Sequence, residues 1–587
     1  MTKIRATLAI VWRIAIPYFN SEDKIAGRSL LAAVIGLQLA SVGADILINA
    51  WRNRFYNALQ EKDWEGFVRE MIVFCVVAGF SVLLAVYQTY LTQWLHIRWR
   101  RWMTTRYLGV WMHDANYYRM QLQGDAADNP DQRLTEDVKS FVNQTLGISV
   151  QLLGSIVSLA SFVVILWGLS AAAPFFVSGY DLSFPGYLVW AALVYAIFGT
   201  ALTQWIGSPL VNLNFQQERY EANFRFDLVR VRENTEQIAL LKGESAERGR
   251  LLQRFGSVAA NWYGIMSRTK RLVAFTQSFT QAAAVFPFIL CAPAYFFAGK
   301  IQLGALMQTA EAFGKVQDSL SFFVTAYTSL ADWRAVVARL DGFETSIKKA
   351  EELAASKSSI QLAPSSTTDT ISIDDLLVEL PNGEPLVTAS SFSISAGDRV
   401  LFTGPSGAGK STLFRAIAGI WPYGSGSVTI PAHASLMMLP QRPYFPIGTL
   451  KAAIVYPAEA DAFSDEQVRD ALVEVGLPKL AQRLDHDDHW NRMLSLGEQQ
   501  RLGVVRALLH APQYLFLDEA TASLDEGSEA KLYRLLAQRL PATTIVSIGH
   551  RSTLAAFHTS RVALTHQGNV FSLQDRSREE MKSSLAE

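Results

Sequence analysis

The stretch "GPSGAGKST", residues 404–412, decides the architecture of the carboxyl-terminal half of the chain. It follows the apolar run "DRVLF" and precedes "LFRAIAGI", which has a helical pattern. Glycines between a strand and a helix let backbone N–H groups wrap phosphate oxygens, and the amino end of the helix adds its dipole. The residues predicted to bind a nucleotide are therefore Gly404, Pro405, Ser406, Gly407, Ala408, Gly409, Lys410, Ser411 and Thr412. Lys410 is expected to reach the β- and γ-phosphates, and Ser411 to bind Mg²⁺.

The stretch "YLFLDEAT", residues 514–521, supplies an acidic pair to the same site. Its four apolar residues predict a buried strand whose end places Asp518 on Mg²⁺, while Glu519 polarises the attacking water. Other strand-like runs, such as "RVLFTG" and "TTIVSIGH", alternate with helical patterns. This alternation predicts an α/β domain with a largely parallel sheet.

Five apolar segments before residue 300 are long enough to cross a bilayer, which takes roughly 20 helical residues. They cover residues 30–47, 71–95, 146–173, 187–206 and 272–298. A chain that is 50% hydrophobic and only 18% charged fits a membrane protein. These spans exclude a soluble ATPase of the repair or translation kind. The loop "PFFVSGYDLSFP" has no Lys or Arg, whereas the connections 98–139 and 219–271 hold many, so the amino terminus is expected in the cytoplasm. Both connections are expected to continue as helices.

A sixth span is needed because five would leave the carboxyl-terminal half outside the cell. Residues 301–330 are the candidate, although they carry one narrow polar stripe: Gln308, Glu311, Lys315 and Asp318. Facing lipid, three charges would cost roughly 8–10 kcal/mol on the insertion scale. We therefore expect the stripe to line a water-filled substrate cavity between subunits. The alternative is an ion network that only holds helices of the dimer together.

The remaining features divide the chain into four parts. The start, "MTKIRATLAIVWRIAIPYFN", lacks a signal cleavage site and predicts an interfacial helix over residues 1–26. A six-helix transmembrane domain is expected over 27–344, a Ser/Thr-rich linker over 345–370, and the nucleotide-binding domain over 371–587. Cys75 and Cys291 lie in apolar runs and predict buried thiols. The formal net charge is zero, which argues against a nucleic-acid partner.

Further motifs stand in the order found in ATP-binding cassette transporters, and over essentially the whole chain the sequence resembles that family. "LPQRP" is similar to its Q-loop, "LSLGEQQRL" to its signature, "SLD" to its D-loop and "SIGHR" to its switch. The resemblance implies ATP and Mg²⁺ as cofactors, with Gln441 joining Ser411 and Asp518 at the metal. It implies catalytic roles for Lys410, Glu519 and His550. It adds these residues to the nucleotide site: Gln441, Ser495, Gly497, Glu498 and Asp525.

In that family two cassettes pair head to tail, and each ATP lies between one phosphate loop and the other subunit's signature. One cassette per chain therefore implies a homodimer. Two residues depart from the family pattern. Leu496 replaces the first glycine of the signature, which predicts a backbone less free to approach phosphate. Leu380 stands near the place of the aromatic residue that usually stacks on adenine, which predicts weaker selectivity for the base.

Two stretches of the membrane half indicate which group of ATP-binding cassette transporters the sequence resembles. They are "ADNPDQRLTEDV" (127–138) and "GSPLVNLNFQQERYEANFRFDLVRVRENTEQIALLKGE" (207–244). Both are similar to the SbmA/BacA-like group and to the related peroxisomal fatty-acyl-CoA transporters. The group implies ATP-driven uptake of peptides or other hydrophilic solutes across a bacterial inner membrane. Three alternatives stay open: an exporter, a fatty-acyl-CoA transporter, and a proton-coupled carrier gated by nucleotide.

Overall fold

The computed structural model describes residues 2–123, 129–171, 176–177, 180–181, 185–292, 296–297, 299, 301–356, 359–365, 369–568 and 570–576. The chain forms two compact units. The first comprises residues 1–108 and 129–343, and the second comprises residues 109–128 and 344–587.

The first unit is almost entirely helical. Its main helices are α1 (Thr2–Phe19), α2 (Lys24–Glu61), α3 (Trp64–Met112), α6 (Val138–Ala171), α7 (Tyr187–Glu233), α8 (Thr235–Leu240), α9 (Glu244–Cys291) and α10 (Leu303–Ala354), with a short antiparallel pair, β1 (Phe176–Val177) and β2 (Tyr180–Asp181). In the described part of the chain, five helices are long and apolar enough to cross a membrane. They correspond to the five predicted spans, although the predictions 146–173 and 272–298 extend beyond the ends of α6 and α9. As predicted, α3, α7 and α9 run on well past their apolar segments.

The sixth predicted span, 301–330, lies within α10 except for its first two residues, and α10 is one continuous helix of 52 residues. Its polar residues keep α10 out of the set of five. Its apolar face nevertheless packs into the bundle: Phe313 and Val316 are fully buried with Phe162 of α6, Leu188 of α7 and Cys291 of α9. The helix therefore lies alongside three of the apolar spans, with its opposite face free for polar contacts.

The outer surface of the bundle is apolar, as a lipid-facing surface must be. On α3 alone, Phe80, Leu83 and Val86 are each more than half exposed. Cys75 belongs to this exposed surface, so its predicted burial is wrong, whereas Cys291 is buried. An apolar run indicates only that a segment avoids water, and lipid satisfies that as well as a protein core does.

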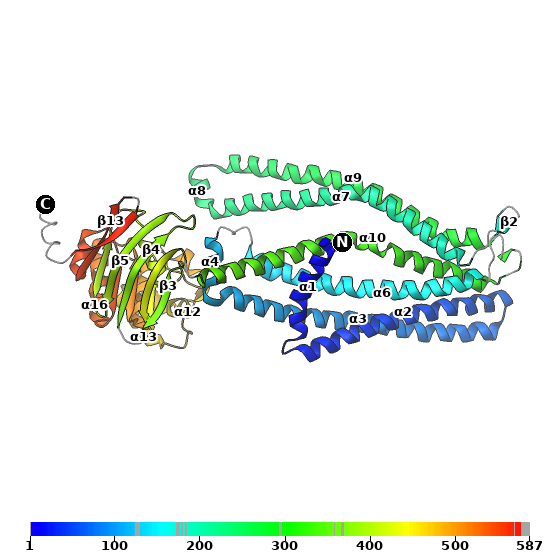
Figure 1. Ribbon diagram of the computed structural model, residues 1–587, viewed down its shortest axis with the longest axis horizontal. Coiled ribbons are helices and arrows are strands. Elements are labelled where there is room, and N and C mark those ends of the chain that lie inside the picture. Colours follow the sequence, from blue (N-terminus) through cyan, green and yellow to red (C-terminus); the bar gives the residue numbers. More distant parts are fainter. Residues whose placement is uncertain are drawn as a thin grey trace. The chain divides into compact units, whose positions relative to one another are not determined.

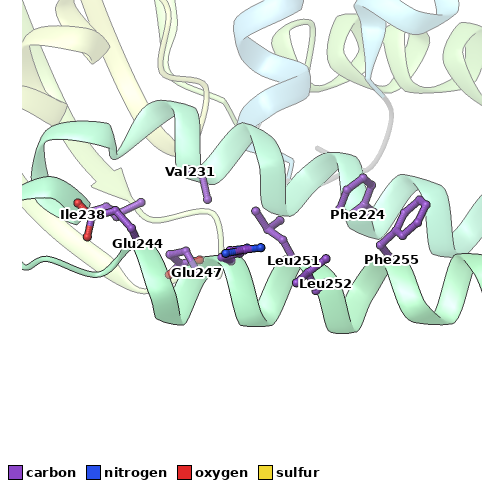
Figure 2. Close-up of a pocket in the computed structure, with 9 residues that line it drawn as sticks. Phe224, Val231, Ile238, Glu244, Glu247, Leu251, Leu252 and Phe255 are labelled. Atoms are coloured by element: carbon purple, nitrogen blue, oxygen red, sulfur yellow. The ribbon is translucent and has the colours of Figure 1, made fainter.

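Helices α7 and α9 run side by side and are joined by the short helix α8 (Figure 1). Asp227 of α7 is buried and accepts from Arg250 at 3.2 Å and from Arg254 at 3.0 Å, both on α9. Beside this contact the pair encloses an apolar pocket of about 490 Å³, into which Phe224 and Phe255 project from opposite helices (Figure 2). The pocket belongs to the first unit and has no residue of the phosphate loop in its lining.

The second unit is built on a ten-stranded sheet in the order β3-β7-β4-β5-β14-β13-β6-β12-β11-β8. The strands are β3 (Gln361–Ser365), β4 (Thr370–Glu379), β5 (Pro385–Ser395), β6 (Arg399–Thr403), β7 (Gly424–Pro431), β8 (Leu436–Leu439), β11 (Tyr514–Asp518), β12 (Thr544–Ile548), β13 (Ser560–Gln567) and β14 (Val570–Arg576). The run from β13 to β8 is parallel. In the other half, β4 pairs antiparallel with β5 and β7, and β13 with β14. Strand β3 pairs parallel with β7, and β5 with β14. The sheet is thus mixed, but most of its neighbouring strands are parallel, as predicted.

Segments outside the carboxyl-terminal range join this second unit. The helix α4 (Asn116–Leu122) belongs to it: Leu122 packs against the core under the antiparallel strands, and Asn116 lies 3.4 Å from the carboxylate of Glu351. The range 345–370, expected as a linker, contains the last turns of α10 and the strand β3.

Candidate functional site

The phosphate loop connects β6 to α11 (Lys410–Ile417) at the carboxyl ends of the parallel strands. Gly404, Gly407 and Gly409 have positive φ angles of 152°, 80° and 83°. A Cβ on Gly409 would lie 2.6 Å from a methyl group of Val387, so a side chain at that position has neither the conformation nor the space. The first N–H groups of α11 have no partner within the helix. The loop therefore presents backbone donors and a helix dipole to an anion.

Lys410 points into the loop that precedes it. Its side chain is buried, and Nζ donates to the carbonyl oxygens of Gly404 at 2.9 Å and Pro405 at 2.8 Å. Burial lowers the pKa of Lys410, while the charges of Glu519 and Asp518 oppose that change. The ammonium group thus stands inside the turn, where phosphate oxygens could replace the two carbonyls as its acceptors.

Ser411 and Asp518 meet although 107 residues separate them. The hydroxyl of Ser411 donates to Oδ1 of Asp518 at 2.8 Å, because β6 and β11 both pair with β12 and end at the same edge. Burial raises the pKa of Asp518, and the hydrogen bond from Ser411 opposes the rise. A hydroxyl and a carboxylate at this spacing are hard oxygen ligands of the kind that Mg²⁺ prefers. These residues therefore fit the predicted metal ion.

Glu519 stands between the Q-loop and the switch. Gln441 donates through Nε2 to its Oε2 at 3.1 Å, and Nε2 of His550 lies 3.1 Å from its Oε1. Glu519 adopts a left-handed backbone conformation with φ 50°, which is uncommon for a residue with a side chain and is often found at functional sites. The structure thus brings together Gln441, which the resemblance assigned to the metal ion, with Glu519 and His550, to which it assigned catalytic roles.

The signature residues form the start of α15 (Leu496–His510). Ser495 caps this helix, and its hydroxyl and backbone N–H both donate to Glu498, at 2.8 and 2.9 Å. Within the described residues, no hydrogen bond joins Ser495 or Glu498 to the phosphate loop of the same chain. Leu496 has no positive φ angle, so a leucine is accommodated there without backbone strain. A Cβ on Gly497 would come within 3.2 Å of Leu524.

Asp525 caps α16 (Glu526–Arg539), where its carboxylate accepts from the backbone N–H of Ser528 at 2.9 Å. The hydrogen bonds from Ser528 lower the pKa of Asp525. Its predicted contact with nucleotide stays a prediction. Leu380, at the predicted position of the missing aromatic, lies in a turn in which its N–H donates to the Glu384 carbonyl.

Two residues that sequence reasoning missed hold the catalytic loops together. Gln500 is 1% exposed; its amide donates to the carbonyl of Gln441 and accepts from the N–H of Ser523, both at 3.0 Å. Arg551 donates to the carbonyls of Leu524 at 2.7 Å and Ala522 at 3.2 Å. Arg551 also pairs with the carboxylate of Glu529 at 3.3 Å. Both residues adjoin recognised motifs, but the contacts that join the loops are made to backbone groups, which leave no trace in the side-chain pattern.

The polar stripe of α10 faces α2 of the same chain. Glu311 accepts from Asn49 at 3.2 Å and pairs with Arg52 at 3.0 Å. Lys315 pairs with Asp45 at 2.7 Å, and Gln308 accepts from Asn53 at 2.7 Å. Nearer the start of α10, the N–H of Gly304 donates to Asn57 at 2.8 Å. We call this set of contacts the α2–α10 seam.

The α2–α10 seam shows that the charges of the stripe pair with a helix of the same chain, and it does not test the predicted water-filled cavity. Glu311 and Lys315, which have the spacing of an intrahelical pair, form their ion pairs with α2 instead. Asp318 is exposed and forms no hydrogen bond or ion pair within the described part of the chain. The Lys315–Asp45 pair is itself half-exposed, with 32% and 40% of the two side chains accessible.

Spans of helix joined to a nucleotide-binding site of this geometry define a membrane transporter driven by ATP. Residues 12–296 match the family described as "ABC transporter transmembrane region 2", and residues 387–522 match "ABC transporter". The chain belongs to the ATP-binding cassette transporters. It therefore uses ATP with Mg²⁺, and it couples ATP hydrolysis to transport.

Relatives match nearly the whole chain. An uncharacterized ABC transporter ATP-binding protein of Haemophilus influenzae is 39% identical over 557 residues, 95% of this chain and 92% of that protein. ABC transporter D family member 2, chloroplastic, of Arabidopsis thaliana is 34% identical, covering 93% and 84%. The lysosomal cobalamin transporter ABCD4 of Mus musculus is 26% identical, covering 96% and 95%. The solved structure of a bacterial Atm1-family ABC exporter with ATP bound has a TM-score of 0.72 at 18% identity, covering 95% and 98%, and shows the same fold.

Proposed function

We propose that the protein is a homodimeric inner-membrane transporter in which each ATP is held by the phosphate loop of one subunit and the signature of the other. The observation that carries this proposal is the division of the site. Lys410, the Ser411–Asp518 pair and Glu519 converge on one place, whereas Ser495 caps a helix with no described bond to that place. Members of this family typically work as dimers, which would complete both sites.

Each residue then has a chemical role. The phosphate loop and Lys410 orient the phosphates, and Ser411, Gln441 and Asp518 hold Mg²⁺, which neutralises the phosphate charge. Glu519 takes the proton of the attacking water, and His550 keeps the carboxylate in position. Ser495, Gly497 and Glu498 approach the γ-phosphate from the partner, with Asp525 at the same interface. In this scheme the chain consists of an interfacial helix (1–26), a membrane domain (27–344), a linker (345–370) and the nucleotide-binding domain (371–587). The amino terminus and the nucleotide-binding domain lie in the cytoplasm.

We further propose that the substrate is a hydrophilic solute that passes along the exposed side of the α2–α10 seam. Asp45, Lys315 and Asp318 keep exposed charge on helices that lie among apolar spans. Charge in that environment must meet water or another subunit rather than lipid. Cobalamin, the solute in the name of the ABCD4 relative, is of this kind, and so are the peptides implied by the SbmA/BacA-like resemblance. A fatty-acyl-CoA is the second candidate, because the chain is also similar to a D-family transporter.

The experiment that tests this function uses proteoliposomes with ATP on one side only. Labelled peptide, cobalamin and acyl-CoA are each supplied on either side, and Lys410→Ala serves as the control without hydrolysis. ATP-dependent accumulation of a hydrophilic solute supports the proposal, and its direction separates uptake from export. Accumulation of acyl-CoA alone would contradict the hydrophilic-solute assignment, and transport by Lys410→Ala that an uncoupler stops would favour a proton-coupled carrier.

Cysteines at positions 311, 315 and 318 test the path itself. They should react with membrane-impermeant thiol reagents, and trapped nucleotide should change the rate, if the stripe lines a water-filled cavity. Since Cys75 is exposed and Cys291 buried, the parent protein for this experiment carries Cys75→Ser. Inaccessibility at all three positions in every state, with transport intact, would mean that the seam only holds α2 and α10 together.

A further inference from the structure

A polar cavity lies where the turn between α1 and α2 meets α3, in a part of the sequence remote from the nucleotide-site residues. Its volume is about 660 Å³. The lining comes from two short segments of the first unit: Ser21, Glu22 and Asp23 in the turn, and Arg98, Arg101, Trp102, Thr105 and Arg106 on α3. Three guanidinium groups around one cavity indicate an anionic ligand.

Pairing within the cavity leaves an excess of positive charge. Arg98 is bound to Asp23 through both carboxylate oxygens, so these two charges cancel. Arg101 and Arg106 form no hydrogen bond or ion pair in the part of the chain that is described, and Arg106 lies over the ring of Trp102 at 5.4 Å. Glu22 is exposed and is likewise without such a partner among those residues. Two guanidinium groups and one carboxylate thus remain available to a ligand.

The cavity lies at the boundary of the membrane. The apolar run of α3 covers residues 71–95, and Arg98 is the first charged residue after it. The apolar run of α2 begins at residue 30, two residues after Arg28. Because Arg98 binds Asp23, these two span ends meet at the same level. Charges at the end of a span stand at the depth of the lipid headgroups.

Nearby aromatic and apolar side chains mark the same depth. Trp94, near the end of the apolar run of α3, is 44% exposed, as expected for a tryptophan in the interfacial belt. On α1, Leu8 and Trp12 are 53% and 70% exposed. An amphipathic helix with such a face lies in the plane of the membrane surface. A ligand of the cavity can therefore have an anionic head and an apolar tail.

We propose that this cavity binds the phosphate group of a membrane phospholipid. Arg101 and Arg106 donate to the phosphate oxygens, a geometry for which the guanidinium fork is suited, and the acyl chains leave along the apolar surfaces of α1 and α3. Glu22 stands beside the phosphate and would accept from the ammonium of an ethanolamine headgroup. Inorganic phosphate shares the anionic chemistry but lacks the tail.

The test measures binding of dihexanoyl-phosphatidylethanolamine to the delipidated full-length protein in detergent, by native mass spectrometry. The double variant Arg101→Gln/Arg106→Gln should bind it about 25-fold more weakly, since a basic residue near a membrane surface contributes roughly 1 kcal/mol. The matched control Arg219→Gln/Arg225→Gln removes two exposed arginines of α7 and should leave the affinity unchanged. Glu22→Gln should weaken the ethanolamine lipid but not the phosphatidylglycerol analogue.

Three outcomes would overturn the proposal. The first is equal lipid affinity in the wild type and in Arg101→Gln/Arg106→Gln. The second is an equal loss in the α7 control, which would indicate a general effect of charge. The third is binding of inorganic phosphate as tight as that of the lipid, which would indicate a site for a free anion. If the glutamine variant does not fold, Arg101→Lys/Arg106→Lys keeps the charge without the fork, and unchanged affinity in it would refute the arginine geometry.

Discussion

Replacing Glu519 with glutamine should separate ATP binding from ATP hydrolysis. Each carboxylate oxygen of Glu519 has one partner at 3.1 Å, Gln441 on one side and His550 on the other. Glutamine has the same shape: its oxygen can accept from Gln441, and its amide can donate to the ring nitrogen of a neutral His550. The variant therefore keeps both contacts and loses only the group that takes a proton from water.

The expected loss of turnover follows from that single change. General-base catalysis contributes about 10²–10⁴-fold, which corresponds to about 3–5 kcal/mol in the activation barrier. Phosphate release at saturating Mg-ATP in nanodiscs measures the loss, and ATP retained after gel filtration measures binding. Glu466→Gln, which neutralises an exposed carboxylate in the first turn of α13 (Asp465–Glu474), is the control and should hydrolyse normally. Hydrolysis near the wild-type rate in Glu519→Gln would refute the assignment of Glu519 as the base.

Three further predictions follow from the second unit. Lys410→Ala removes the buried ammonium and should abolish ATP hydrolysis and ATP-driven accumulation together; accumulation retained without hydrolysis would contradict ATP coupling. Gln500→Ala breaks the link between Gln441 and Ser523 and should lower kcat roughly tenfold with little change in KM for ATP, because the phosphate loop is untouched; an unchanged kcat would mean that the link is only structural. Burial lowers the pKa of His558 to about 4, below its value in the unfolded chain, so this residue makes the folded state less stable as pH falls from about 6.5 to 4, by up to about 1.4 kcal/mol per pH unit. Unfolding temperatures across that range should depend less on pH in His558→Asn than in the exposed control His489→Asn, and equal slopes would contradict the assignment.

The nucleotide site could be predicted because its motifs are contiguous and three of them follow or end a strand. Ser411 follows β6, Asp518 ends β11 and His550 follows β12, and these strands are neighbours in a parallel sheet. Parallel strands bring their carboxyl ends to one edge, so the sequence order of the motifs already implied their meeting. The contacts by which Gln500 and Arg551 join the loops could not be predicted in the same way, because they are made to carbonyl and N–H groups whose positions depend on the folded loops.

The antiparallel pairs of the sheet, in which β4 joins β5 and β7 and β13 joins β14, were not predicted, for a different reason. The sequence runs that predicted parallel strands are short and continuously apolar, as in β11 and β12, which are buried on both faces. Strands β4 and β5 instead alternate between buried and exposed residues along much of their length. In β4, Asp374 and Asp375 interrupt the apolar pattern, and the register shifts after Asp374. An apolar pattern interrupted in this way does not resemble the continuously apolar strands from which the sheet was predicted, so the sequence did not indicate β4 or its antiparallel pairing.

The α2–α10 seam shows what helical phase can and cannot establish. The spacing of Glu311 and Lys315 placed them opposite Phe313 and Val316, and the structure buries the two apolar residues among helices. Phase does not name the partner, and the prediction looked for it in a second subunit. The missed signal is a matching set on α2, at helical spacing: Asp45, Asn49, Arg52, Asn53 and Asn57. Each ionic contact of the seam joins opposite charges, so pairing removes most of the free-energy cost of placing these charges among apolar spans. The exposed Asp318 is the charge that still requires water or a partner.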